Sequence, residues 1–335
     1  MGGKAMAIVG VETERKNTKD HLRIQALMVT KIEQLFKTEV ATVAFFRNKE
    51  SHGDVDLLIR NTGNLGNIAE ILKENFGPVH SNGNVFSFEF EKYQIDVIPQ
   101  AERYWKTAQT FFDWDPTGNL MGKIAHKFGL KYGFQGLVYP FRSFSGRLSK
   151  DITISLDDRE IFKFLGFDYD TYLAGFNSVE DVFEYVINSK YFIAENFKME
   201  NLSAIDRKRN KKRKTYQEFL EYVNKKGIEN QVNFTFSKDK DTYIDIIDQQ
   251  FPGSEFVHKL EILKIKDKIA KQSSEMFNGR LVMELTDLSG KDLGKVLGDF
   301  KDYLTEKTNL PFSNAIVSDK NIMETFKQWY RGNLN

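Results

Sequence analysis

The chain has 335 residues, no cysteine and a formal net charge of +1. Hydrophobic residues make up 41% and aromatic residues 13% of it, which is enough apolar material for two or three packed domains and excludes an intrinsically disordered chain. The absence of cysteine excludes disulfides, thiol nucleophiles and cysteine-zinc sites, and the five histidines are scattered without ligand spacing. With the net charge near zero, any basic surface must be local.

No apolar run approaches the length of a membrane span, and residues 1–11 lack the layout of a signal peptide. We therefore expect a soluble, cytoplasmic protein with no membrane partner.

In the first hundred residues, helical spacing of apolar side chains predicts two helices, over residues 18–37 and about 66–75. β-branched, aromatic or alternating segments predict four strands, at residues 38–46, 54–59, 86–90 and 93–99. These elements predict a mixed sheet with helices on one face.

Beyond the sheet, residues 119–131 are expected to be helical, and acidic residues at 157–160 open another helix. Long charged helices dominate from about residue 176. The fold class is therefore α+β, and three parts are predicted: a sheet domain at 1–100, a middle segment at 101–175 and a mainly helical domain at 176–335.

Three acidic residues stand out in the predicted sheet. Asp54 and Asp56 alternate with apolar residues, so both project to the same side of their strand. Asp96 lies in a second apolar strand and adds a third carboxylate if the two strands are neighbours. Three carboxylates on rigid elements suit Mg²⁺ ions that also hold substrate phosphates, although acids at a solvated strand end are common. The pattern predicts phosphoryl or nucleotidyl transfer.

These motifs, taken in order, resemble those of the nucleotidyltransferase superfamily, and within it most closely the family X DNA polymerases. The resemblance spans about residues 40–175. It rests on Arg47, Gly53-Asp54-Val55-Asp56, Ile95-Asp96-Val97-Ile98-Pro99, Asp115-Pro116-Thr117-Gly118-Asn119, Ala125-His126-Lys127-Phe128-Gly129-Leu130 and the segment 158–166. It implies a palm followed by a thumb-like segment, and transfer of a nucleoside monophosphate from an NTP or dNTP to a nucleic-acid 3′ hydroxyl.

The resemblance also implies roles for individual residues. Asp54, Asp56 and Asp96 would be catalytic and would bind two Mg²⁺ ions, with Mn²⁺ as a possible substitute. The nucleotide would be held by Arg47, Lys49, Ser51, Gly53, Thr117, Gly118 and Asn119. Val43-Ala44 stands where the family has glycine-serine, so the grip on the triphosphate falls to Arg47, Lys49, Ser51 and backbone amides.

The densest charge in the chain is a run of seven cations in eight residues, which we call the basic segment. It comprises Arg207, Lys208, Arg209, Asn210, Lys211, Lys212, Arg213 and Lys214. Such a run is either a grip for nucleic acid, DNA or RNA, or a solvated linker. Residues 277–297 are faintly similar to the helical body of CCA-adding enzymes and poly(A) polymerases, and an unrelated helical bundle is an equal alternative.

Two other functions remain open at this point. The same fold could transfer a nucleotide to a protein or small molecule, or it could be a weakened module that only binds nucleotides or nucleic-acid ends. The sequence does not indicate an oligomeric state.

Overall fold

The computed structural model describes residues 4–333. Contacts between Cα atoms divide the chain into two compact units. The first contains the chain up to Tyr139 together with Thr153–Ser254, and the second contains Pro140–Ile152 together with the chain from Glu255 onward. Residues 153–254 therefore group with the sheet, while the functional division at residues 100 and 175 stays a prediction. None of the described helices is both long and apolar enough to cross a membrane.

The first unit is built on a five-stranded mixed sheet with strand order β2-β4-β7-β6-β5. Its strands are β2 (Val40–Thr42), β4 (Asp54–Asn61), β5 (Val79–Asn82), β6 (Val85–Phe90) and β7 (Tyr93–Ala101). The central pair β4 and β7 is parallel, and the other neighbours are antiparallel. Together with the helices described below, this sheet confirms the α+β fold class.

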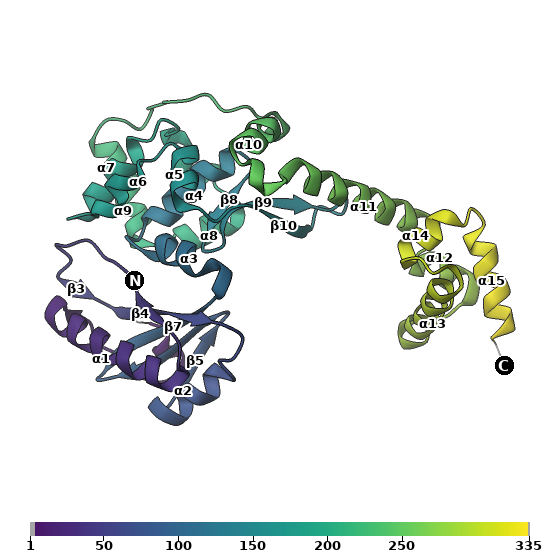
Figure 1. Ribbon diagram of the computed structural model, residues 1–335, viewed down its shortest axis with the longest axis horizontal. Coiled ribbons are helices and arrows are strands. Elements are labelled where there is room, and N and C mark those ends of the chain that lie inside the picture. Colours follow the sequence, from purple (N-terminus) through teal and green to yellow (C-terminus); the bar gives the residue numbers. More distant parts are fainter. Residues whose placement is uncertain (1–3, 334–335) are drawn as a thin grey trace. The chain divides into compact units, whose positions relative to one another are not determined.

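Helices α1 (Thr18–Phe36) and α2 (Ile68–Phe76) cover one face of the sheet (Figure 1). Both begin at an asparagine whose side chain accepts a hydrogen bond from a backbone N–H in the first turn, as helix N-caps do. Their apolar side chains recur at helical spacing and are buried against alternate residues of β4 and β7. The opposite face is covered in part by α3 (Trp105–Phe112), whose Trp105 packs on Leu58 and Ile98.

The first strand is shorter than the sequence predicts. Residues 38–46 were expected to form it, but β2 ends at Thr42. The chain then leaves the sheet, because the backbone of Ala44 bonds to Asp113 and Trp114. Three short strands were not predicted at all, because their sequences are mostly polar. They are β5 and the paired strands β1 (Lys16–Asn17) and β3 (Ser51–His52).

The rest of the first unit is mainly helical. Its remaining α-helices are α4 (Thr117–Lys127), α5 (Asp158–Leu165), α6 (Tyr169–Ala174), α7 (Val179–Ile187), α8 (Ala204–Asn210), α9 (Lys214–Lys225) and α10 (Ile244–Gln250). Short 3-10 helices occur at η1 (Met6–Val9), η2 (Glu102–Tyr104), η3 (Ala194–Phe197), η4 (Met199–Asn201), η5 (Lys240–Tyr243) and η6 (Pro252–Ser254). A small sheet of order β10-β9-β8 comprises β8 (Lys131–Gly133), β9 (Gly136–Arg142) and β10 (Leu148–Ser155).

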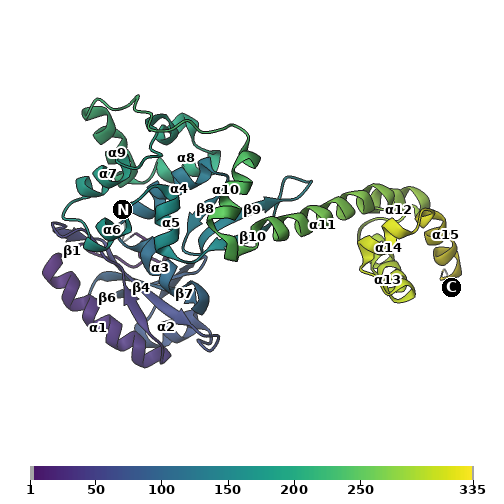
Figure 2. The same cartoon turned by 45° about the horizontal axis from the view of Figure 1, so that its top comes forward.

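The second unit is helical apart from the ends of β9 and β10. Its helices, labelled in Figure 2, are α11 (Phe256–Met276), α12 (Gly279–Thr286), α13 (Gly290–Thr308), α14 (Phe312–Ser318) and α15 (Ile322–Gly332). Its core is strongly aromatic: Phe277, Phe300 and Phe326 are buried and contact one another as rings. The mainly helical C-terminal half predicted from the sequence is confirmed.

Candidate active site on the carboxylate face of the sheet

The three predicted carboxylates lie on the two central strands. In the parallel pairing of β4 with β7, Asp56 is opposite Asp96 and Asp54 is opposite Gln94. Paired residues of neighbouring strands share a face of the sheet, and residues two apart on one strand share it as well. The intervening residues, such as Val55 and Val97, are buried under α1 and α2. The carboxylates therefore share the opposite face, as the sequence predicts.

Burial and mutual repulsion raise the pKa values of two of these carboxyl groups. Burial raises the pKa of Asp56 well above its usual value, and the nearby charges of Asp54, Asp96 and Asp115 raise it further. The pKa of Asp96 is raised to about 6, mainly by burial and also by Asp54, while a hydrogen bond from Ser87 opposes the shift. Negative charge is thus concentrated here, and it disfavours full ionisation of the metal-free site.

Gln94 fixes the orientation of Asp96. Its Nε2 donates to both carboxylate oxygens of Asp96, at 3.0 Å and 3.0 Å. Its Oε1 accepts from the backbone N–H groups of Ala5 and Met6, at 2.8 Å and 3.4 Å, so the amide cannot turn without losing these bonds. Sequence analysis missed Gln94. Its position two residues before Asp96 on the same strand face was the available signal.

The donor set fits divalent cations. Carboxylate oxygens are the ligands that Mg²⁺ prefers, and a cation would relieve the repulsion that raises the pKa values of Asp56 and Asp96. Between residues 4 and 333, no group of three or more His, Cys, Asp or Glu side chains is placed to hold a metal ion. Metal binding by Asp54, Asp56 and Asp96 therefore stays a prediction.

Lys49, a predicted nucleotide ligand, lies close to these acids. It is half-buried, and its ammonium is 5.7 Å from the ring centroids of Phe45 and of Phe46. Burial lowers its pKa, whereas attraction to Asp54, and to Asp115 and Asp56 after it, opposes the shift. The structure thus brings a cation to the carboxylates, where a phosphate could be held.

Ser51 and Gly53 flank the start of β4, next to an arginine that sequence analysis missed. The Oγ of Ser51 accepts from Arg15 Nε at 2.8 Å, and its carbonyl accepts from a terminal nitrogen of Arg15 at 2.7 Å. Gly53 is buried between His52 and Asp54. Arg15 therefore adds a second cation to this approach. It lies nearly forty residues before the motif, where no spacing rule points to it.

Arg47 has protein partners of its own. Its guanidinium donates to the carbonyl of Ala174 at 2.5 Å and to Asn177 Oδ1 at 3.0 Å, and its backbone N–H donates to the carbonyl of Phe176. These bonds tie the loop after β2 to the connection between α6 and α7. The side chain is exposed and keeps further donors, so phosphate binding by Arg47 stays a prediction.

The chain at Val43-Ala44 is occupied by contacts within the protein. The N–H of Ala44 donates to Asp113 Oδ1 at 2.7 Å, and its carbonyl accepts from the N–H of Trp114 at 2.9 Å. Burial raises the pKa of Asp113 to about 6, and the bond to Ala44 opposes the shift. Neither backbone group of Ala44 is free for a triphosphate.

The predicted nucleotide ligands at the start of α4 have structural roles here. The Oγ1 of Thr117 donates to the carbonyl of Trp114 at 2.6 Å. Gly118 approaches Phe111 so closely that a Cβ would lie 2.5 Å from its carbonyl oxygen. Asn119 Nδ2 is 3.3 Å from Asn210 Oδ1 in the basic segment. Nucleotide contact by these three residues stays a prediction.

The basic segment spans the end of α8 and the start of α9. All its cations are exposed except Arg213, which is half-buried. Burial lowers the pKa of Arg213, and the attraction of Asp115, which also acts on Asp56, opposes this. The buried Lys123 of α4 forms an ion pair at 3.0 Å with the half-buried Asp206 of α8, the residue just before the segment, and so connects α8 to α4. Asp115 therefore interacts electrostatically both with one end of the basic segment and with Asp56.

A network of aromatic and histidine side chains supports the first residue of β4. Tyr93 Oη donates to the carbonyl of Asp54 at 2.8 Å and lies 2.8 Å from His21 Nδ1. Because the hydroxyl proton is already used, His21 must donate from Nδ1. His21 stacks on His52 with ring centroids 3.9 Å apart. Burial, together with nearby Lys49, lowers their pKa values to about 3 and about 4, so both rings are neutral at pH 7.

We expect Tyr93→Phe to destabilise the protein by about 1–3 kcal/mol, because it removes the hydroxyl that bonds to the Asp54 carbonyl and deprives the buried His21 Nδ1–H of its acceptor. The measurement is urea unfolding followed by far-ultraviolet circular dichroism. Tyr330→Phe is the matched control, since no hydrogen bond involves the Tyr330 hydroxyl in the described part of the chain. Equal stability of the two variants would contradict the assigned role.

Comparison with known proteins gives a partial likeness in fold. No family model matches the chain, and no curated protein matches it. Among solved structures, it is similar to a polymerase beta from Leishmania infantum in a ternary P/T complex, with a TM-score of 0.37 and 14% identity. That match covers 47% of this chain and 74% of the other. In the ternary gap complex of the same polymerase, the TM-score is 0.32 at 14% identity, covering 38% of this chain and 52% of the other.

Proposed function

We propose that this protein is a metal-dependent nucleotidyltransferase that transfers a nucleoside monophosphate from an NTP or dNTP to a nucleic-acid 3′ hydroxyl and releases pyrophosphate. One observation carries the proposal. Asp56 is opposite Asp96 on two paired parallel strands, and Asp54 is on the same face. Three carboxylates on one rigid surface are the arrangement that two-metal phosphoryl transfer requires.

The chain's own residues have distinct tasks in this proposal. Asp54, Asp56 and Asp96 would hold the metal ions, which when bound lower the pKa of the attacking hydroxyl and stabilise the leaving pyrophosphate. Gln94 orients Asp96, which in this proposal accepts the proton of the attacking hydroxyl. The 3′ oxygen forms a bond to the α-phosphorus, and the bond from that phosphorus to pyrophosphate breaks. Lys49 supplies positive charge for the phosphates.

The acceptor is proposed to be a nucleic acid because of the basic segment. Its exposed cations could neutralise backbone phosphates, and Arg213 lies close enough to Asp115 for their charges to interact. Asp115 also acts on Asp56, so the same acid links this end of the segment electrostatically to the carboxylates.

A primer panel tests the proposal. Gapped DNA, single-stranded DNA and transfer RNA are incubated with Mg²⁺ or Mn²⁺ and each labelled NTP and dNTP, and products are separated by electrophoresis. We expect extension of at least one acceptor, dependent on the metal and accompanied by pyrophosphate release. Failure to extend any of them, or extension that persists in excess EDTA, would refute the proposal.

One observation favours a second function, a module that binds nucleotides without turnover. Ala44, at the position where the triphosphate would be gripped, has its N–H and its carbonyl bonded to Asp113 and Trp114. Calorimetry with Mg²⁺ and each NTP separates the two functions. Saturable binding with no product over hours would support the module, whereas turnover would exclude it.

A further inference from the structure

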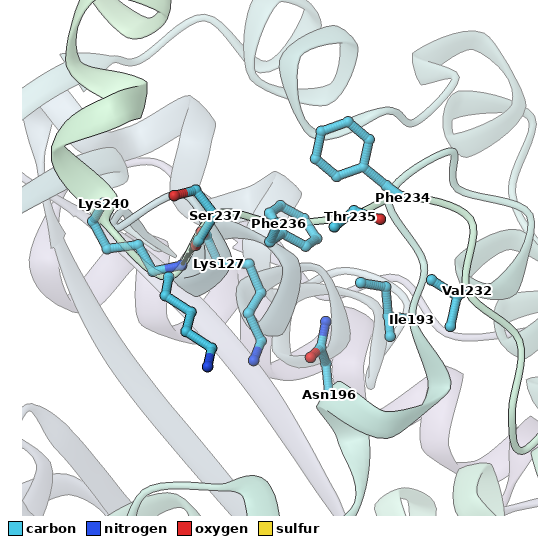
Figure 3. A pocket seen from close by; sticks show the side chains of 10 residues that line it. Lys127, Ile193, Asn196, Val232, Phe234, Thr235, Phe236, Ser237 and Lys240 are labelled. Carbon is cyan, nitrogen blue, oxygen red and sulfur yellow. Dashed lines mark hydrogen bonds between the residues drawn. The ribbon is translucent and has the colours of Figure 1, made fainter.

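A cavity of about 440 Å³ lies at the C-terminal end of α4 (Figure 3). It is open to solvent and is lined by that end of α4, by η3 and by the segment between Val232 and Lys240. Its volume falls in the range of small-molecule sites, about 300–1,000 Å³. All its lining residues belong to the first unit. The proposed function does not use it.

The lining carries positive charge and no acid. Three lysines contribute to it, namely Lys127, Lys238 and Lys240. Lys240 Nζ is fixed by the carbonyls of Lys127 and Ser237, at 2.5 Å and 3.1 Å. In the part of the chain that the structure describes, no ion pair involves any of the three. Burial lowers the pKa values of Lys127 and Lys240, and the charge of Lys127 lowers that of Lys240 further. An anion is the partner that this lining lacks.

The lining also offers aromatic and polar surface. The rings of Phe234 and Phe236 line the cavity together with the amide of Asn196 and the hydroxyl of Thr235. Figure 3 draws Lys127 and Asn196 on one side of the segment that carries these rings. Rings supply stacking surface for a base, lysines bind phosphate, and amide and hydroxyl groups can bond to base edges.

We propose that this cavity binds a nucleoside phosphate, with the phosphate at Lys127 and Lys238 and the base against Phe234 or Phe236. The ligand is either a free nucleotide or one unit of a bound strand, since both present the same chemistry.

The cavity is separate from the carboxylate face. Asp115, whose charge acts on Asp56, lies just before the first residue of α4, whereas Lys127 is its last residue. Ten residues of helix separate Thr117 from Lys127, which corresponds to about 15 Å. Binding at the cavity should therefore need neither the carboxylates nor a metal ion.

The test is calorimetric titration of the full chain with ATP in excess EDTA at physiological salt. We expect saturable binding that the double variant Lys127→Gln/Lys238→Gln weakens by at least about tenfold. The matched control is Lys31→Gln/Lys73→Gln, which removes the same charge from exposed positions on α1 and α2 and should bind as the wild type does. Asp56→Asn should also leave this binding unchanged, so that failure here and failure of the proposed transfer are distinguishable.

Competition identifies the source of the ligand. A short oligodeoxythymidylate that displaces ATP and binds more tightly than ATP assigns a strand unit, whereas tighter binding of ATP assigns the free nucleotide. No binding of ATP in EDTA would overturn the proposal, as would equal binding by the cavity variant and the wild type, both with native circular dichroism. If pyrophosphate displaced ATP as effectively as unlabelled ATP does, the base would contribute nothing to binding. That result would overturn the proposal that the ligand is a nucleoside phosphate.

Discussion

Asp56→Asn is expected to abolish nucleotidyl transfer and to raise the thermal unfolding midpoint of the metal-free protein. The substitution removes a carboxylate that the proposed chemistry requires, and we expect at least about a thousandfold loss of rate. It also removes a carboxyl group whose ionised form is disfavoured by burial and by the charges of Asp54 and Asp96. Asp56→Asn should therefore lose activity and gain stability. A substitution that merely unfolded the protein would lower both.

The pH dependence follows from the direction of the pKa shifts. The carboxyl of Asp96 has its pKa raised from 3.8 to about 6 in the folded protein, so the metal-free folded state binds this proton more tightly than the unfolded chain. The resulting stabilisation is present below about pH 4 and is lost as pH rises through 6. The advantage of Asp96→Asn over the wild type should therefore be largest at pH 7 and shrink toward pH 4.

Calorimetric melting in EDTA and in excess Mg²⁺ provides the measurement. Magnesium should raise the midpoint of the wild type, because it binds the folded state, and should raise that of Asp56→Asn much less. Glu33→Gln on α1 is the matched control, an exposed acid in the same unit that should change neither rate nor midpoint. An equal Mg²⁺ response in Asp56→Asn and the wild type would show that these carboxylates do not bind the ion.

The local parts of the site could be predicted from the sequence because they depend on alternation along one strand. Asp54 and Asp56 flank Val55, and period two alone puts the acids on one face and the apolar residue on the other. The place of Asp96 required one further assumption, that its strand is a neighbour of β4. The register with Asp56 opposite Asp96 bears this out.

The partners of the predicted binding residues could not be predicted, because they come from distant parts of the chain. Arg47 bonds to the connection after α6, about 130 residues later. The side chain of Gln94 accepts a hydrogen bond from the backbone N–H of Ala5, which lies far before it in the sequence. No periodicity or spacing rule relates such pairs, since they depend on how the helices pack. Gly118 shows the same limit: its closeness to Phe111 follows from the packing of α4 on α3.

Neutralising Lys208, Arg209, Lys211 and Lys212 to glutamine is expected to weaken binding of single-stranded oligonucleotides on the order of a hundredfold at low salt. All four side chains are exposed, so their removal should leave the fold intact. Each phosphate contact contributes a slope of about −0.7 to the dependence of log affinity on log salt for single strands, so the slope should fall in magnitude by about 3. Fluorescence anisotropy over a series of salt concentrations measures both quantities.

The control removes the same charge from exposed positions on or directly after α1 and α2, through Lys19, Lys31, Lys37 and Lys73. If the basic segment is only a solvated linker, both quadruple variants should bind equally, because net charge alone would then govern affinity. If it binds nucleic acid, only the variant of the basic segment should show a smaller slope of log affinity against log salt. We expect the second outcome, because Arg213 at one end of the segment interacts electrostatically with Asp115, an acid that also acts on Asp56. The same variant should then raise the KM for the acceptor far more than it lowers kcat, since it leaves Asp54, Asp56 and Asp96 untouched.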